Sequence, residues 1–340
     1  MSLDCLNKYE KSQICVLSDK NLIRHPLWEQ LPALKDCPVL WLDVNEQNKS
    51  LETVTQIWNF LFEHGITRRG LLICIGGGVL TDLGGFAAST YKRGIDYINI
   101  PTTLLSMVDA SSGGKTGFNY RGLKNSIGTF APPVAVLIDP TLLGTLPADQ
   151  FLSGFGEMLK TGLIESTDLL WDRLLLYDLD TMPSEGLKEL IEQCLTIKAR
   201  IVQADPHETG LRKTLNFGHT FGHALEEMSF VYRTSSNRPL LHGYAVVYGL
   251  IAELYLSVTK LGCPQEPLQQ LTQLMLHHYG KPQCKCSDFD RLIALMQQDK
   301  KNEHAALINC TLIRSIGDPV INQVISPADA REALDYLFSL

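Results

Sequence analysis

The chain has 340 residues, of which 45% are hydrophobic and 20% are charged, and its formal net charge is −7. This length allows two domains with substantial cores, and the acidic balance argues against nucleic acid as a general partner. No uninterrupted apolar run reaches the length of a membrane-spanning helix, and no signal-peptide pattern is present, so no membrane association is expected. The nine scattered cysteines are typical of reduced thiols, and we expect a cytoplasmic enzyme.

The first 145 or so residues alternate short apolar runs with helical patterns. Helical periodicity marks residues 53–64 and 82–91. Five runs have the composition of strands buried on both faces: 13–19, 38–44, 71–75, 97–100 and 134–138. This alternation predicts a parallel α/β sheet in an N-terminal domain of residues 1–147.

After Leu146-Pro147 the pattern becomes helical and stays so to about Gln298. A β-like segment from Leu307 to Val324, with a turn at Gly317-Asp-Pro319, precedes a final helix at about 327–338. The helical pattern is interrupted at Pro183, Pro206, Pro239 and Pro264. We therefore predict an all-helical second domain, residues 148–340, with this β segment near its end.

A glycine-rich turn, Gly76-Gly77-Gly78, follows the strand predicted at 71–75 and opens a helix that contains Asp82. Amides at a helix N-terminus attract pyrophosphate oxygens, and glycine lets a ligand approach the backbone closely. The segment is not the GxGxxG fingerprint, so a plain tight turn is the alternative. It is nevertheless placed correctly for a dinucleotide site.

Three charged residues follow the first two predicted strands: Asp19, Glu46 and Lys49. In such a sheet the carboxyl edge binds the adenosine hydroxyls of a dinucleotide, so all three are candidates for that role. A solvated surface charge is the alternative for each.

The segment from Pro101 to Gly117 begins as a strand end and is predicted to continue as a polar loop. Gly113-Gly114-Lys115-Thr suggests a P-loop, but Asp109 stands where that motif requires glycine. An acid and a lysine remain, followed by Lys124-Asn125, and this set suits a polyhydroxylated anion. An ordinary lysine-containing surface loop is the alternative.

Two histidines, His219 and His223, lie one helical turn apart on a predicted helix, so both can address one zinc ion. Two hydrogen-bonded histidines are the alternative. His242 and the upstream Glu157 would complete a shell of two histidines and a carboxylate with an open position for substrate. A second metal site at Cys284-Lys-Cys286 with the nearby His277-His278 is disfavoured, because its spacing is not that of a known zinc finger.

A polar stripe leads into this helix. Arg212, Asn216, His219 and His223 step by four, three and four residues, so one continuous helix would project all four from one side. Such a stripe is costly in a core, because each polar group needs a partner. The pattern indicates the wall of a polar pocket.

Taken together, the motifs from the glycine triplet to Asp299-Lys300-Lys301 resemble those of the 3-dehydroquinate synthase family of sugar-phosphate cyclases. They stand in the family's order over well over half of the chain. The resemblance implies a dehydroquinate synthase-like fold, with an α/β domain that binds NAD and a helical domain that binds Zn²⁺ or Co²⁺. It implies Glu157, His219 and His242 as the metal ligands, and it makes His223 a substrate contact.

Further roles follow only from the resemblance. Arg93 would reach the substrate phosphate from a neighbouring subunit, which implies a homodimer, and Glu208 would support the site. The residues implied to surround a sugar-acid phosphate are Asp109, Lys115, Asn125, Lys160, Lys198, Arg212, Asn216, His223 and one of Lys300 and Lys301, of which Lys300 is favoured. The residues implied or proposed to bind or support NAD are Asp19, Glu46, Lys49, Gly77, Gly78, Asp82, Thr102, Thr103, Lys115, Lys124 and Thr145.

The family's enzymes convert 3-deoxy-D-arabino-heptulosonate 7-phosphate into 3-dehydroquinate and phosphate, a lyase step of the shikimate pathway for aromatic amino acids. Transient oxidation of a ring hydroxyl by NAD acidifies the neighbouring C–H so that phosphate can leave, and the hydride is then returned. Two alternatives stay open: another sugar-phosphate cyclase, whose substrate lacks the carboxylate, and a metal-dependent alcohol or glycerol dehydrogenase. The many cationic residues argue against the dehydrogenase, because a small neutral polyol does not need them.

Overall fold

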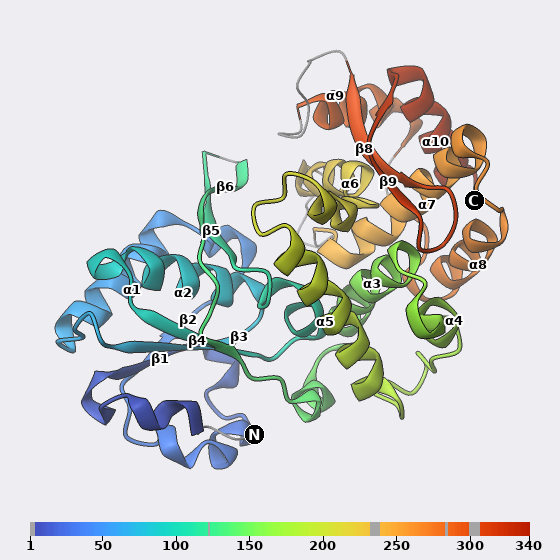
Figure 1. Cartoon of the computed structure of the whole chain (residues 1–340). Coiled ribbons are helices and arrows are strands. Elements are labelled where there is room, and N and C mark those ends of the chain that lie inside the picture. The colour runs from blue at the N-terminus through green and yellow to red at the C-terminus, as the bar shows by residue number, and fades with distance from the viewer. Residues whose placement is uncertain (1–3, 122, 232–238, 283–284, 299–306) are drawn as a thin grey trace. The chain divides into compact units, whose positions relative to one another are not determined.

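The structure is a computed structural model that describes residues 4–121, 123–231, 239–282, 285–298 and 307–340. The chain divides into two compact units, Met1–Leu146 and Pro147–Leu340 (Figure 1). This boundary lies one residue before the one expected from the change in sequence pattern.

The first domain is built on a five-stranded, all-parallel sheet with the strand order β2-β1-β3-β4-β7. Central β3 is buried along its whole length, whereas the edge strands β2 and β7 are mostly half-buried, so the expectation of burial on both faces is wrong for these two strands. The parallel α/β arrangement itself is confirmed. The strands are β1 (Ile14–Asp19), β2 (Val39–Leu42), β3 (Leu71–Gly76), β4 (Asp96–Pro101) and β7 (Ala135–Val136).

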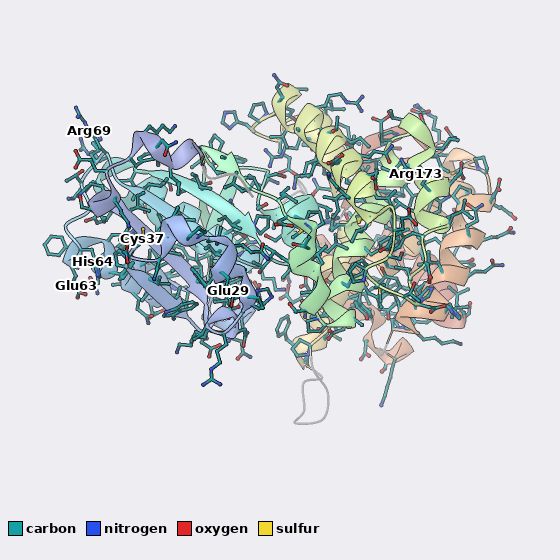
Figure 2. The ribbon with its side chains drawn as sticks, turned by 90° about the horizontal axis from the view of Figure 1, so that it is seen from below. Glu29, Cys37, Glu63, His64, Arg69 and Arg173 are labelled. Atoms are coloured by element: carbon teal, nitrogen blue, oxygen red, sulfur yellow. The ribbon has the colours of Figure 1, made fainter. Side chains whose placement is uncertain are left out.

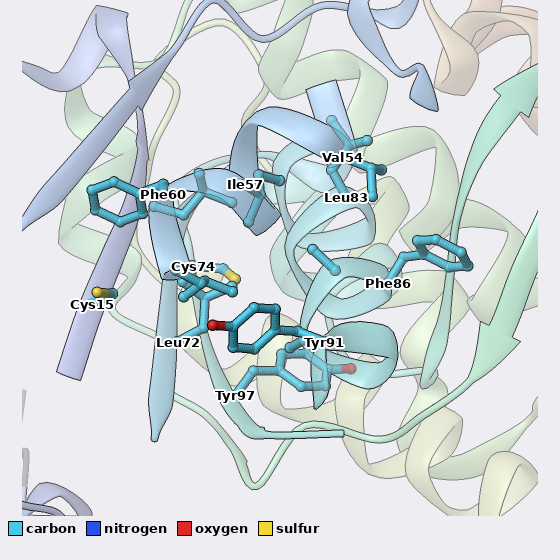
Figure 3. Close-up of a cluster of buried hydrophobic side chains, with 14 of the residues drawn as sticks. Cys15, Val54, Ile57, Phe60, Leu72, Cys74, Leu83, Phe86, Tyr91 and Tyr97 are labelled. Carbon is cyan, nitrogen blue, oxygen red and sulfur yellow. The ribbon is translucent and has the colours of Figure 1, made fainter. Parts of the chain in front are cut away.

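Two helices, α1 (Leu51–Glu63) and α2 (Gly78–Thr90), cover one face of this sheet (Figure 1). Their buried side chains meet those of the strands in one apolar cluster, to which the helices contribute Ile57 and Phe86 and β3 contributes Cys74 (Figure 3). Short 3-10 turns occupy the other connections before residue 50: Asp4–Lys8, Lys11–Gln13, Lys20–Leu22, Pro26–Gln30, Pro32–Leu34 and Glu46–Asn48.

The surface of the first domain at the end of α1 is polar. Glu63, His64 and Arg69 are exposed and project outward, whereas Cys37 is buried within the fold (Figure 2). The helix is amphipathic, because Val54, Ile57 and Leu61 recur on the face that packs on the sheet.

The polar loop predicted around residues 109–125 is not a loop in the structure. Ser106–Ala110 forms a π-helical turn, and β5 (Lys115–Tyr120) pairs with β6 (Leu123–Phe130) as an antiparallel hairpin. The prediction failed because β6 carries polar residues and glycine, and its side chains alternate only between exposed and half-buried positions. Such a strand lacks the apolar pattern that marks a buried one.

The second domain is mainly helical, as predicted, and the four prolines fall between its helices. Helix α7 packs against α3, α6 and α10. The hairpin of β8 (Ile308–Ile313) and β9 (Pro319–Ile325) confirms the late β segment, so the domain is not strictly all-helical. The helices are α3 (Ala148–Ile164), α4 (Leu170–Leu175), α5 (Leu187–Ala204), α6 (His219–Val231), α7 (His242–Leu261), α8 (Glu266–Leu274), α9 (Phe289–Gln297) and α10 (Pro327–Ser339).

Helix α7 is long and apolar enough to cross a membrane if length and composition alone are considered. However, 67% of its most apolar window is buried inside the domain. Glu253 near its middle is fully buried and accepts hydrogen bonds from the backbone N–H groups of Gly218 and Thr220. These are the contacts of a core helix in a globular domain.

Candidate active site

Three helices of the second domain bring Glu157, His219 and His242 together. The Oε1 atom of Glu157 lies 3.1 Å from Nε2 of His242 and 3.5 Å from Nε2 of His219. One ligand atom from each residue lies within 4.8 Å of the other two. A carboxylate and two imidazoles at this separation form a set that suits a divalent transition metal.

Glycines next to the candidate ligands allow the helices to approach closely. Gly156 and Gly243 lie where α3 crosses α7, next to Glu157 and His242 respectively. A Cβ atom on Gly243 would lie 1.7 Å from the carbonyl oxygen of Ser153, and one on Gly156 would lie 2.5 Å from the carbonyl oxygen of Gly243. Any side chain there would force the helices apart, so these glycines set the distance between the two candidate ligands.

A third glycine separates the polar stripe into two pieces, which corrects the expectation of one continuous helix. Leu211–Asn216 is a 3-10 helix, and α6 begins only at His219. Gly218 lies between them with φ +80°, in the left-handed region that favours glycine. Arg212 and Asn216 therefore do not share a helix face with the two histidines.

Both imidazoles present Nε2 to Glu157, because an oxygen lies beside each Nδ1. Nδ1 of His219 lies 3.1 Å from the carbonyl oxygen of Phe217, and Nδ1 of His242 lies 3.4 Å from Oε2 of Glu226. Metal-binding histidines commonly donate their second N–H group to such an oxygen, which fixes the ring and the tautomer. The donor set therefore fits a metal with two Nε2 ligands and one carboxylate.

The charges of this cluster are strongly coupled. Burial alone would raise the pKa of Glu157, but Lys160, with which it forms an ion pair, and His242 hold this pKa well below its ordinary range. Burial alone would lower the pKa of His242, but hydrogen bonds with Glu157 and Glu226 raise it to about 10. Glu157 is thus kept anionic, and a metal that bound here would displace a proton from His242.

His223 lies beside the cluster, but not in the set of converging ligand atoms. Its ring centroid is 5.1 Å from that of His219 and 5.9 Å from that of His242, and its side chain is exposed. The HxxxH pair suggested by spacing alone is thus replaced by Glu157, His219 and His242. This geometry leaves His223 accessible to a bound small molecule.

Three further candidates in the second domain are buried cations: Lys160 on α3, Lys198 on α5 and Arg212 in the 3-10 helix. Arg212 donates from Nη1 to the carbonyl oxygen of Pro206 at 2.8 Å. Buried cations of this kind are typical of sites that bind anions.

Asn216 and Glu208 form a pair near these cations. The Asn216 side-chain amide donates to Oε1 of Glu208 at 2.7 Å, and the supporting role of Glu208 stays a prediction. The Lys300 and Lys301 candidates lie outside the described residues.

In the first domain, the glycine turn lies at the carboxyl edge of the sheet. β3 ends at Gly76, Gly77 is the N-cap of α2, and the helix begins at Gly78. The neighbouring β4 ends directly before Thr102 and Thr103, and a Cβ atom on Gly77 would lie 3.3 Å from Cγ2 of Thr103. The predicted NAD contacts that follow β3, Gly77 and Gly78, are therefore adjacent in the fold to those that follow β4, Thr102 and Thr103.

Lys49 is buried, not solvated, and it links two other candidates. Its Nζ atom lies 2.5 Å from Oδ2 of Asp82 and donates at 2.5 Å to Oδ1 of Asn125. Burial raises the pKa of Asp82, and Lys49 opposes this effect, while the carboxylates of Glu46 and Asp109 add to it. Asp109 thus lies close enough to Asp82 to affect its charge.

The remaining first-domain candidates are less closely grouped. Asp19 caps the turn after β1 by accepting from the backbone N–H of Asn21, and Thr145 is paired with His25 at 2.8 Å. Glu46 accepts at 2.8 Å from the side-chain amide of Asn119 in the hairpin. Arg93 is exposed with φ +69°, and the hairpin carries exposed Lys115 and half-buried Lys124.

Sequence reasoning missed Glu226 and Glu253, the two buried acids that contact the elements carrying the histidines. Glu226 falls seven residues after His219, on the same helix face, and this spacing was the available signal. For Glu253 the only signal was a lone acid within an otherwise apolar helix.

A second group of potential ligands, Asp180, His277 and His278, also lies within mutual reach, but Asp180 and His277 are exposed. This group contains the two histidines of the disfavoured second metal site but no cysteine. Cys284 of the disfavoured cysteine site lies outside the described residues.

Two family models match adjoining segments of this chain. One, for the 3-dehydroquinate synthase N-terminal region, matches residues 39–153, and one, for the 3-dehydroquinate synthase C-terminal region, matches residues 154–302. A 3-dehydroquinate synthase from Parabacteroides distasonis is 44% identical over 335 residues, which cover 98% of this chain and 93% of that protein. One from Streptococcus pyogenes is 38% identical and covers 90% of this chain and 84% of its own length.

Solved structures show the same fold. A 2-epi-5-epi-valiolone synthase from Streptomyces hygroscopicus, with NAD⁺ and Zn²⁺ bound, has a TM-score of 0.82 and 28% identity, with 96% of this chain and 91% of that chain covered. A 2-deoxy-scyllo-inosose synthase complexed with carbaglucose-6-phosphate, NAD⁺ and Co²⁺ has a TM-score of 0.80 at 22% identity, with 98% and 93% covered. The dehydroquinate synthase-like fold is thereby confirmed, and the chain belongs to the 3-dehydroquinate synthase family.

Proposed function

We propose that this chain converts 3-deoxy-D-arabino-heptulosonate 7-phosphate into 3-dehydroquinate and inorganic phosphate, as a carbon–oxygen lyase of aromatic amino acid biosynthesis. Membership of the family supports the reaction. The observation that carries the proposal to particular residues is the convergence of Glu157, His219 and His242, with Lys160 paired to the acid. This arrangement would place a metal beside a buried cation, and a reaction that polarises a substrate oxygen and expels phosphate can use both.

We assign Glu157, His219 and His242 as ligands of Zn²⁺ or Co²⁺. The donor set and the orientation of both rings support this assignment, as do the metals bound to the valiolone and inosose synthases. A metal held there would supply Lewis-acid polarisation of substrate oxygens. Glu157 is suited to its role because Lys160 keeps its carboxylate charged.

We assign NAD to the first domain, at the turn of Gly77 and Gly78, with Thr102 and Thr103 beside it. Support comes from the free amides at the N-terminus of α2, which no side chain caps. NAD would accept a hydride and return it within one turnover, so the cofactor is required but not consumed. Asp82 and Lys49 form the buried pair behind this turn. We also retain Asp19, Glu46, Lys115, Lys124 and Thr145 as candidates for binding or supporting the cofactor.

We assign the substrate to a set of polar and cationic residues. Lys160, Lys198 and Arg212 would neutralise the carboxylate and the leaving phosphate, because buried cations stabilise such charge far better than solvated ones do. Asn216 and His223 would donate to hydroxyl or carboxylate oxygens. Asp109, Lys115 and Asn125 of the first domain, and Lys300, stay candidates for substrate contacts on the resemblance alone.

We further propose a homodimer in which Arg93 acts at the site of its partner, and a cytoplasmic location. Arg93 is exposed and is held in an unusual backbone conformation, so its side chain is available to another subunit. The seven cysteines described are all free thiols, which agrees with a reducing compartment.

Two other functions, another sugar-phosphate cyclase and an alcohol dehydrogenase, would differ from this proposal in substrate and product. The valiolone synthase likeness favours a cyclase whose substrate lacks the carboxylate, whereas the iron-containing alcohol dehydrogenase likeness, at 13% identity, concerns the fold alone. The test is phosphate release from the heptulosonate phosphate and from a matched sugar phosphate without the carboxylate. We expect release only from the first substrate. Preferential release from the second would contradict the proposal.

A further inference from the structure

Helices α6 and α7 each contribute one buried carboxylate to the ligand-bearing end of the other. On α6, Glu226 lies with Oε2 3.4 Å from Nδ1 of His242, the first residue of α7. On α7, Glu253 accepts from the backbone N–H groups of Gly218 at 2.7 Å and Thr220 at 3.1 Å, on either side of His219. The two contacts are therefore reciprocal.

We propose that Glu226 and Glu253 are positioning residues that hold His242 and His219 in the geometry needed for tight metal binding. Neither residue is proposed to touch the metal or the substrate. The inference rests on the metal site of the proposed function and assigns a task to two acids that this function leaves unexplained.

Glu226 acts on the tautomer of His242. A ring that binds a metal through Nε2 is a neutral imidazole, which carries its proton on the other nitrogen, and the Glu226 carboxylate beside Nδ1 favours this Nδ1–H form. Glu226 is only 7% exposed, so solvent competes weakly for its oxygen. An amide at this position would offer a donor as readily as an acceptor and would lose this selection.

Glu253 acts on the backbone that carries His219. Its two oxygens bind separate N–H groups, Oε2 that of Gly218 and Oε1 that of Thr220, so the carboxylate bridges the residue between them. Free N–H groups at a helix N-terminus carry partial positive charge, which stabilises a buried carboxylate there. These two hydrogen bonds keep the first turn of α6 from rotating about the helix axis, and they thereby fix the direction of the His219 side chain.

The test measures metal affinity in the full-length chain. Zn²⁺ would be titrated against a chromophoric chelator, and Co²⁺ binding would be followed by visible absorption. We expect Glu226→Gln to weaken Zn²⁺ binding by about 10–100-fold, the range typical of lost partners of metal-binding histidines, and to change the Co²⁺ spectrum. Glu227→Gln, at the adjacent exposed position, is the matched control and should bind like the unmodified chain.

Glu253→Asp tests the second contact, since aspartate keeps the charge but is too short to bridge both N–H groups. We expect weaker Zn²⁺ binding, restored in part by higher metal concentration. If the Glu253→Asp variant does not fold, the Glu226→Gln variant alone decides the proposal, because replacing Glu226 by glutamine leaves the backbone contacts of α6 with the core unchanged.

The outcomes distinguish this inference from the proposed function. Loss of metal in His242→Ala together with unchanged affinity and spectrum in Glu226→Gln would overturn the positioning role and leave the metal site intact. Retention of tight metal binding in His242→Ala would overturn the metal site itself.

Discussion

The Nε2 atom of His242 lies 3.1 Å from Oε1 of Glu157, although the two residues are 85 positions apart in the chain. The contact exists because α3 and α7 cross with glycine on both sides, at Gly156 and Gly243. The proposed metal site is therefore a property of helix packing in the second domain, and changes to that packing should change metal binding.

Gly243→Ala tests this dependence directly. The added methyl group would lie 1.7 Å from the carbonyl oxygen of Ser153, so α3 and α7 must separate. We expect a loss of about 1–3 kcal/mol in the free energy of unfolding, the usual cost of overpacking, and a large loss of Zn²⁺ affinity. Urea unfolding and metal titration measure the two effects.

Gly262→Ala is the matched control, at the C-cap of the same helix. Its φ of +71° disfavours alanine, but no atom lies within 4 Å of the added methyl group. It should cost about 1 kcal/mol and leave metal affinity unchanged. Equal metal affinity in both variants would show that the helix crossing does not control the site.

His242→Ala should remove bound metal and phosphate release together. The variant leaves Glu157 and His219, and two ligands hold a divalent metal far more weakly than three. Metal content of the purified protein and the phosphate assay give the two readouts. His277→Ala, at an exposed position of the second group of potential ligands, should keep both. Unchanged metal content in His242→Ala would refute the assigned ligands.

Lys49→Met should destabilise the first domain. The methionine side chain fills similar space but leaves the Asp82 carboxylate without its buried cation, at a cost of about 2 kcal/mol, since the Asp82 side chain retains some exposure. It should also raise the pKa of Asp82 further and weaken NAD binding. Adding Asp82→Asn should recover part of the lost stability, whereas a double variant as unstable as the sum of the singles would contradict this pairing. Urea unfolding of each variant provides the measurement.

The Asp205 carboxylate binds the backbone N–H of Arg212, and it should make the stability of the fold depend on pH in the acidic range. Burial would raise the pKa of Asp205, but hydrogen bonds from the backbone N–H groups of Gly210, Thr209 and Arg212 lower it from 3.8 to about 2. Because the folded pKa is depressed, this group stabilises the fold above pH 3.8, and the contribution is lost as the pH falls towards 2.

Asp205→Asn should therefore be less stable at pH 7 and should lose less stability between pH 4 and pH 2 than the unmodified chain. Urea unfolding at several pH values measures both slopes, and the exposed Asp335→Asn is the control. Parallel pH profiles for Asp205→Asn and the unmodified chain would contradict the assigned role.

Arg93→Ala should impair turnover more than folding, because the side chain is exposed. If Arg93 acts in the partner's site, mixing this variant with His242→Ala should restore activity in mixed dimers, each of which has one intact site. Sedimentation would establish the dimer. A dimer without restored activity would show that Arg93 does not act across subunits.

Much of the first domain could be predicted because its strands are continuous apolar runs. β3, from Leu71 to Gly76, is buried on both faces, so local composition was enough to identify it. The β5–β6 hairpin could not be identified in this way, because its stability depends on tertiary contacts: it packs on α2, and Lys49 holds Asn125 from another segment.

The candidate site shows the same limit. Spacing placed His219 and His223 correctly on one helix. It could not show that Glu157 and His242, which lie on other helices, form the candidate metal ligands with His219 and that His223 does not. The prediction of one continuous helix from Arg212 was wrong, because the 3-10 helix ends at Asn216 and Gly218, in the left-handed conformation, separates it from α6. Glu226 could not be given a role, because its partner comes from the next helix.

The most direct test of the account is the cofactor balance of a single reaction. The Zn²⁺-loaded chain would be incubated with excess heptulosonate phosphate and NAD⁺ far below the substrate concentration, while phosphate and absorbance at the NADH wavelength are followed together. The account predicts many phosphates released per NAD⁺ with no net NADH. NADH formed in step with product, or phosphate release that stops after one equivalent per NAD⁺, would contradict it.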